Sequence, residues 1–268
     1  MQEIVDDFVQ HGFVRVEGAF PETVAADCRA LLWEDVRRQV PGIDPEDPAT
    51  WTEPVVRLGD HAEEPFRQAA NASRLTEALD VVVGAGRWVP RQSLGTTPVR
   101  FPSTESAGDD GWHVEGSFRG DAGEHDYFRW RVNVASQDRA LLMLFLFSDV
   151  GEDEAPTRLR VGSHRVVARL LAPYGEEGRQ MLPLSVAAAE ETAQLPVALA
   201  TGRAGDVYLC HPFLVHAAQR HQGARPRFMA QPGLHPAAAF DVVDGTSAVE
   251  VAIRDALAEE TARTGQRE

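Results

Sequence analysis

The sequence predicts a mainly β fold, a β-sandwich or open barrel, with flanking helices. Three observations carry this prediction. Apolar side chains recur at helical spacing over residues 1–86, short apolar stretches bounded by turn-forming residues follow over residues 87–235, and a helical pattern returns over residues 236–268. We therefore expect a single domain over residues 1–268, with a helical scaffold, a β core and a helical tail. The length suits one large core, because all-β domains commonly reach it.

The N-terminal scaffold is expected to be mostly helical, with one short strand. Pro21 suits the first position of a helix, since the N–H that proline lacks needs no partner there. Ser73 is expected to cap a later helix, which stops at Gly84. The expected helices cover residues 5–10, 21–40 and 75–83, and the expected strand covers residues 13–17.

The β core is expected from short apolar segments that lie between turn residues. Within residues 128–134 every second residue is apolar, which is the pattern of a strand with two different faces. The expected strands cover residues 88–93, 97–101, 127–135, 141–147, 159–161, 207–209 and 228–231. Helices are expected at residues 165–172, after a Gly-Ser-His turn, and at residues 246–261 in the tail.

The charge and the cysteine content exclude several classes of function. A net charge of -15 argues against binding to nucleic acid or to an anionic membrane surface, because both need a basic footprint. All 26 basic residues are Arg, which excludes lysine Schiff-base chemistry and a P-loop lysine. The longest apolar run, residues 140–147, is far shorter than the roughly 20 residues of a membrane helix. With only Cys28 and Cys210 and no secretory pattern, we expect a reduced, cytoplasmic protein.

One short motif brings together two metal-binding side chains. His113 and Glu115 stand two residues apart, and on a strand such positions point to the same face. An imidazole and a carboxylate suit a divalent first-row metal, and a second, distant histidine would complete the facial triad of non-haem iron(II) enzymes. His216, which follows an alternating apolar segment, is the expected third ligand.

A second feature links His216 to Arg227. The residues between them are rich in turn formers, so we expect a hairpin centred near residues 221 and 222. Residues placed symmetrically about such a centre lie on neighbouring strands and share a face. Arg227 would then lie near the metal, where a guanidinium can hold a dicarboxylate through two parallel hydrogen bonds.

The order of these motifs resembles the phytanoyl-CoA dioxygenase family of iron(II)- and 2-oxoglutarate-dependent oxygenases. The similarity runs through residues 7–14 (DFVQHGFV), 111–115 (GWHVE), 144–150 (LFLFSDV), 155–164 and 216–227, which together span most of the chain. The resemblance implies a double-stranded β-helix, also called a jelly roll or cupin-like fold. It implies Fe(II) held by His113 and His216, 2-oxoglutarate anchored by Arg227, and dioxygen as the oxidant.

Two positions depart from the family pattern. The family usually has Asp where this chain has Glu115, which is one methylene longer but is used as a ligand by other oxygenases of this fold class. The position two after the distal histidine often carries a hydroxyl that helps to hold 2-oxoglutarate, and here it is Ala218. Thr157 is the expected substitute donor.

The resemblance implies oxidation of a small organic molecule, with hydroxylation as the default outcome and a natural-product intermediate as one class of substrate. Trp112, Phe118 and Trp130 are expected to line the mouth of the pocket. Three alternatives stay open: a non-catalytic jelly-roll homologue that only binds a ligand, a halogenase in which chloride replaces the carboxylate ligand, and a desaturase or epimerase. The sequence does not predict an oligomeric state.

Overall fold

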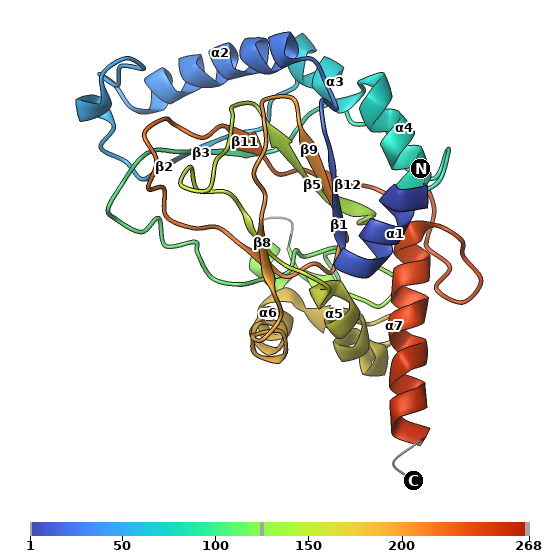
Figure 1. Cartoon of the computed structure of the whole chain (residues 1–268). Coiled ribbons are helices and arrows are strands. Elements are labelled where there is room, and N and C mark those ends of the chain that lie inside the picture. The colour runs from blue at the N-terminus through green and yellow to red at the C-terminus, as the bar shows by residue number, and fades with distance from the viewer. Residues whose placement is uncertain (1, 124–125, 266–268) are drawn as a thin grey trace.

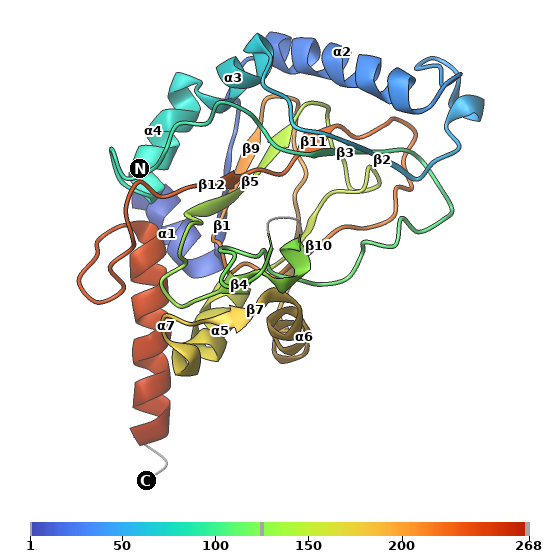
Figure 2. The same cartoon turned by 180° about the vertical axis from the view of Figure 1, so that it is seen from behind.

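Antiparallel strands occupy the middle of the molecule, and helices lie around them (Figures 1 and 2). The structure, a computed structural model, describes residues 2–123 and 126–265. The largest sheet has the strand order β1-β9-β5-β11, and β12 also pairs with β5. Its strands are β1 (Phe13–Val16), β5 (Leu141–Leu146), β9 (Val207–Cys210), β11 (Met229–Ala230) and β12 (Gly233–Leu234).

Strand β5 is the centre of this sheet, and all of its residues are buried. The side chains of a strand alternate between its two faces. Leu141, Met143 and Phe145 pack into the larger apolar cluster, which the N-terminal helices also enter. Leu142 and Leu144 pack into a smaller cluster on the other face. A strand that is apolar on both faces therefore separates two layers of core.

A second antiparallel sheet has the order β10-β6-β8, and two further strand pairs flank the sheets. The strands of this second sheet are β6 (Arg158–Arg160), β8 (Val197–Leu199) and β10 (His216–Ala217). The flanking pairs are β2 (Val55–Leu58) with β3 (Thr97–Arg100), and β4 (Arg131–Val132) with β7 (Arg179–Gln180).

The helices cover the strands on three sides (Figure 1). Helices α2, α3 and α4 follow one another along one side, α5 and α6 lie on the opposite side, and α1 and α7 lie at one end. The helices are α1 (Gln2–His11), α2 (Glu22–Gln39), α3 (Glu64–Ala70), α4 (Ser73–Val82), α5 (Ser163–Leu171), α6 (Met181–Glu191) and α7 (Ala248–Gly265), with short 3-10 turns η1 (Pro48–Thr50), η2 (Tyr127–Arg129) and η3 (Ala172–Tyr174). In the part of the chain that the structure describes, no helix combines the length and the apolar character needed to cross a membrane.

Most of the predicted elements are present, but two strand predictions are wrong. Residues 127–135 form the turn η2 and the two-residue strand β4, and Phe128 is 65% exposed, so the alternation of apolar residues there does not reflect burial. Residues 88–93 contribute only an isolated bridge between Trp88 and Pro236. The fold is thus a mixed arrangement of helices and antiparallel sheets, with less strand than the sequence predicts.

The predicted helix starts at Pro21 and Ser73 are each displaced by one position. Pro21 is the N-cap of α2 and takes an extended conformation, whereas Ser73 is already inside α4 and makes no capping hydrogen bond. Helix α6 was not predicted, although its buried residues Met181, Leu184, Ser185 and Ala188 recur at helical spacing.

Candidate functional site

Three side chains from distant parts of the chain converge at the end of the second sheet. His113 and His216 form an antiparallel bridge in which each backbone N–H donates to the other residue's carbonyl at 3.0 Å. The two rings lie with their centroids 4.3 Å apart. Glu115 Oε1 lies 3.4 Å from His216 Nε2 and 3.9 Å from His113 Nε2. One atom of each residue can therefore meet at a point, since all three lie within 4.8 Å of one another.

Backbone carbonyls orient both imidazole rings. His113 Nδ1 lies 2.8 Å from the carbonyl of Gly111, and His216 Nδ1 lies 3.0 Å from the carbonyl of Leu214. In the neutral ring Nδ1 therefore carries the proton and Nε2 presents its lone pair toward Glu115, as in most histidine metal ligands. Burial and the neighbouring His216 also lower the pKa of His113, which favours the neutral form. Two neutral imidazoles and a carboxylate are a donor set that fits iron(II).

The far oxygen of Glu115 is held by residues that the sequence analysis did not identify. The Tyr127 hydroxyl donates to Glu115 Oε2, and Arg139 Nη2 lies 4.0 Å from the same oxygen. Burial opposes ionisation of this carboxyl, but the neighbouring His216 and the charge of Arg139 lower its pKa overall, so it is a carboxylate.

Close packing around Gly116 fixes Tyr127. Its hydroxyl accepts the Gly116 N–H at 3.1 Å, and its ring packs on Trp130 with centroids 5.1 Å apart. A Cβ at Gly116 would lie 2.9 Å from the Cβ of Trp130 and 3.4 Å from the Tyr127 ring, so only glycine allows this approach. No sequence signal marked Tyr127, because it lies in a turn that resembled a strand.

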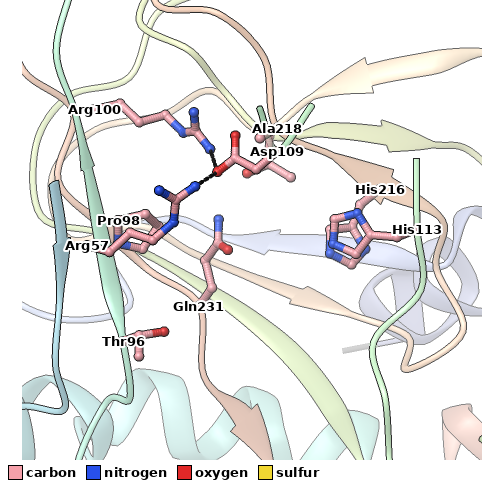
Figure 3. Close-up of a pocket in the computed structure, with 10 residues that line it drawn as sticks. Arg57, Thr96, Pro98, Arg100, Asp109, His113, His216, Ala218 and Gln231 are labelled. Atoms are coloured by element: carbon pink, nitrogen blue, oxygen red, sulfur yellow. Dashed lines mark hydrogen bonds and ion pairs between the residues drawn. The ribbon is translucent and has the colours of Figure 1, made fainter. Parts of the chain in front are cut away.

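A cavity of about 260 Å³ opens beside the two histidines (Figure 3). Thr157 and Ala218 line it next to His216. Arg57, Arg100 and Asp109 line the side away from the histidines, where Asp109 accepts hydrogen bonds from both arginines. The cavity thus has two of the three converging donor residues, His113 and His216, at one end and positive charge at the other. That arrangement can hold a dianion with one end at a metal.

Arg227 is completely buried beside this cavity wall rather than in its lining. Its Nη1 donates to the carbonyl of Ala155, while Nε and Nη2 have no hydrogen-bond partner among the described residues. Burial and the charge of Arg100 lower the pKa of Arg227 to about 9. A buried cation with two unused donors is costly unless an anion completes it.

The predicted hairpin between His216 and Arg227 is wrong. His216 pairs with Leu159 in the second sheet, whereas Arg227 forms a bridge with Arg100 and leads into strand β11 of the first sheet. The chain between them crosses from one sheet to the other, and the backbone N–H groups of Gln222 and Gly223, which both donate to the carbonyl of Asp153, hold its tip. Proximity of Arg227 to the site comes from packing between sheets.

Thr157, the expected substitute for the hydroxyl missing at Ala218, lines the same cavity as Ala218. It is 1% exposed and lines the cavity, and its hydroxyl contacts only the sulfur of Met229, at 3.5 Å, among the described residues. It therefore keeps its hydrogen-bonding capacity for a ligand. The expected role of Thr157 stays a prediction.

The three expected substrate-binding aromatics lie outside this cavity. Trp112 is covered by the guanidinium groups of Arg158 and Arg160, at 4.7 and 4.2 Å from its ring centroid. Phe118 and Trp130 line a separate open hollow. Their role toward a substrate stays a prediction.

Comparisons with known proteins identify the family and similar folds. The family of phytanoyl-CoA dioxygenases matches residues 8–229. No curated protein matches the sequence at a significant level. Among solved structures, the carbocyclase SnoK from nogalamycin biosynthesis, described as non-haem and α-ketoglutarate dependent, is 18% identical with a TM-score of 0.60 and covers 89% of this chain and 85% of its own.

Two Streptomyces proteins are similar in fold to the same degree. AviO1 from Streptomyces viridochromogenes is 17% identical with a TM-score of 0.58, over 90% of this chain and 96% of that one. HygX from Streptomyces hygroscopicus, solved with nickel and 2-oxoglutarate, is 19% identical with a TM-score of 0.52, over 88% and 87%. The chain belongs to the phytanoyl-CoA dioxygenase family, and the predicted non-haem iron, 2-oxoglutarate-dependent enzyme is thereby confirmed at the level of the family.

Proposed function

We propose that this chain oxidises, by default hydroxylates, a small organic molecule, with His113, Glu115 and His216 binding Fe(II) and Arg227 and Thr157 binding 2-oxoglutarate. The observation that carries the proposal is the convergence of the three donor atoms within 4.8 Å at the end of a cavity. The opposite wall of that cavity carries positive charge, and the buried Arg227 lies next to Arg100 of that wall, where a guanidinium can bind a carboxylate.

The residues present divide the work of such a reaction. When bound, Fe(II) would activate dioxygen while 2-oxoglutarate is oxidised to succinate and carbon dioxide. His113 and His216 offer neutral Nε2 atoms whose direction is fixed from the backbone, and Glu115 adds one negative charge. Three protein ligands leave positions open for the co-substrate and dioxygen. Arg227 neutralises the far carboxylate in a site without water contact.

The arrangement of the sheets supports a jelly roll as the fold of a single domain over residues 1–268. The two antiparallel sheets carry the two halves of the site: His216 lies on the second sheet and Arg227 leads into the first. Ligand sites commonly lie in the mouths of β-barrels. A reduced cytoplasmic location remains the expectation from Cys28 and Cys210, which are both free thiols.

The class of substrate is inferred from the structural neighbours. SnoK comes from nogalamycin biosynthesis, the epimerase SnoN was solved with Fe³⁺, α-ketoglutarate and a nogalamycin derivative, and HygX was solved with hygromycin B. A multi-ring natural-product intermediate is therefore the first class of substrate to test.

The test is anaerobic titration of the protein with Fe(II) and 2-oxoglutarate. A keto acid chelating Fe(II) gives a weak visible charge-transfer band, which we expect in the wild type. His216→Ala should abolish the band, and Arg227→Gln should require tenfold to a few hundredfold more 2-oxoglutarate, because a charge-assisted hydrogen bond contributes about 1.5–3 kcal/mol. A band of wild-type intensity in His216→Ala would place the distal ligand elsewhere.

Glu115 separates this proposal from a halogenase and from a non-catalytic homologue. Glu115→Ala should lose iron or turnover, because two imidazoles alone hold the metal poorly, and Glu115→Asp should bind iron less well, because the shorter side chain draws the carboxylate away from Tyr127. Iron affinity and succinate production are measured in parallel. If all three proteins bind iron and form succinate alike, Glu115 is not a ligand.

A further inference from the structure

Two arginines lie side by side at one wall of the cavity, Arg100 in the lining and Arg227 next to it, outside the lining. Arg100 and Arg227 face each other across an antiparallel bridge, with N–H···O bonds of 3.0 and 2.8 Å in the two directions. Directly opposite residues of such a pair project from the same face of the strands. Both side chains are buried, at 4% and 0% exposure, so two like charges share one poorly solvated place. An anion is needed to offset them.

A carboxylate of the protein itself supplies part of this anion. Asp109 Oδ2 accepts from Arg100 Nη2 at 2.7 Å and from Arg57 Nη2 at 2.6 Å (Figure 3). Burial opposes its ionisation, but the hydrogen bond and charge of Arg100 lower the pKa of Asp109 overall. Asp109 lines the same cavity as Ala218, the position where the family often has its hydroxyl donor.

The match between these groups is incomplete. Among the described residues, Asp109 Oδ1 has no hydrogen-bond partner, and neither have Arg100 Nε and two nitrogens of Arg227. Three buried donors and one oxygen of Asp109 are therefore unused. Asp109 engages Arg100 through a single oxygen and forms no hydrogen bond with Arg227. A carboxylate placed between the two arginines would use donors that Asp109 leaves free.

We propose that Arg100 is the second anchor of the distal carboxylate of 2-oxoglutarate, and that Asp109 is a resident carboxylate that this group displaces from Arg100. The inference rests on the proposed function and assigns two further residues to the co-substrate site. Arg100 adds a charged donor to those of Arg227 and Thr157 in a cavity where Ala218 supplies none. Asp109 keeps Arg100 paired while the pocket is empty and stays attached to Arg57 when the co-substrate arrives.

A competing carboxylate and a supporting carboxylate give opposite results on substitution. If Asp109 competes for Arg100, Asp109→Asn should tighten 2-oxoglutarate by about threefold to tenfold, because the neutral amide holds the guanidinium less strongly. If Asp109 only orients Arg100, the same substitution should weaken binding. Arg100→Gln should weaken binding by about tenfold or more, as expected for loss of one charge-assisted contact.

Calorimetric titration of 2-oxoglutarate into Mn(II)-loaded protein measures these affinities without turnover. Arg67→Gln is the matched control, since Arg67 is 42% exposed, pairs with Glu64 at the surface and does not line the cavity. It should leave the affinity unchanged. A loss in Arg67→Gln as large as that in Arg100→Gln would mean that general positive charge, and not a specific anchor, holds the ligand.

Failure of the inference and failure of the proposed function give different patterns. If the wild type does not bind 2-oxoglutarate, or if Arg227→Gln binds it equally well, the proposed function fails. If Arg227→Gln weakens binding while Arg100→Gln does not, or if Asp109→Asn weakens binding, only the present inference fails. Thermal unfolding and Mn(II) affinity are recorded for each variant. Should Arg100→Gln fail to fold, the sign of the Asp109→Asn effect decides.

Discussion

At the scale of single residues, the extra methylene of Glu115 is accommodated by what holds its far oxygen. A longer side chain has one more rotatable bond, so an unsupported glutamate would lose more entropy than an aspartate on binding a metal. Tyr127 removes this freedom in advance, because its hydroxyl fixes Oε2 while Oε1 faces the two histidines. The tyrosine is itself fixed by the Gly116 N–H and by Trp130.

Tyr127→Phe should therefore weaken the binding of the metal while leaving the fold intact. The ring still packs on Trp130, but the carboxylate of Glu115 regains its rotation, and we expect metal affinity to fall by about tenfold, the lower end of outer-shell effects. Tyr174→Phe is the control, since Tyr174 is 45% exposed and lies in η3. Mn(II) binding followed by electron paramagnetic resonance reports the affinity. Equal affinities in the two variants would contradict a positioning role for Tyr127.

At the scale of elements, two buried histidines join α1, α5 and the end of β9. His164 Nε2 donates to the carbonyl of Val9 in α1, and its ring lies 4.9 Å from that of His211. His164 Nδ1 and His211 Nε2 have no partner among the described residues. A Cβ at Gly12 would lie 2.4 Å from His164 Nδ1, so the backbone of Gly12 packs against the unprotonated nitrogen. This joint, the contact that His164 and His211 make among α1, α5 and the end of β9, therefore requires neutral imidazole rings.

This joint should make the fold sensitive to acid. Burial lowers the pKa of His164 from 6.5 to about 3 in the folded chain. Between these two pH values the unfolded chain binds a proton at His164 and the folded chain does not. Stability is therefore lost as the pH falls from about 6.5 toward 3, by about 2 kcal/mol at pH 5 for this one residue. The urea concentration at the unfolding midpoint should fall less between pH 7 and pH 5 for His164→Gln than for the wild type. For His235→Gln, at an exposed position, it should fall as much as for the wild type.

The sequence predicted elements and short-range pairs better than contacts between distant loops. The spacing of His113 and Glu115 predicts a shared face because strand geometry fixes it, and the structure places them together. Arg57, Asp109 and Tyr127 lie in a short strand, a loop and a turn with no periodic pattern, and only tertiary packing brings them to the site. Local spacing carries no information about such encounters. The mistaken hairpin shows the same limit, since symmetry about a turn does not reveal a crossing between sheets.

At the scale of the whole molecule, one ion pair ties the C-terminal helix to the body. Glu250 in α7 is 0% exposed and accepts from both Nη atoms of Arg87, at 2.7 and 2.6 Å. The same carboxylate accepts the N–H of Asp241 at 2.8 Å and the N–H of Ser247 at 3.0 Å, which closes the loop before the helix. Helix α7 in turn packs on α1 and α5.

Glu250→Gln should lower the free energy of unfolding by about 3 kcal/mol, because it leaves Arg87 facing a buried site without its counter-charge. Glu259→Gln is a matched substitution on the same helix. Glu259 is about half exposed and pairs with Arg165 at the surface, so its loss should cost less than about 1 kcal/mol. Thermal unfolding of the two variants beside the wild type makes the comparison. Similar melting temperatures for both would show that the tie does not hold α7.

The two backbone bridges of the site, His113 with His216 and Arg100 with Arg227, together set the distance between the metal site and the guanidinium groups. Each bridge is held by a pair of backbone hydrogen bonds and does not depend on side-chain rotamers. The distance between the metal site and the guanidinium groups therefore adjusts little to the ligand. A keto diacid with one carbon fewer would not reach both ends of the site, and one with an extra carbon would have to bend to fit. Oxaloacetate and 2-oxoadipate should therefore compete with 2-oxoglutarate at least about tenfold more weakly, the usual cost of a single methylene in a fitted site.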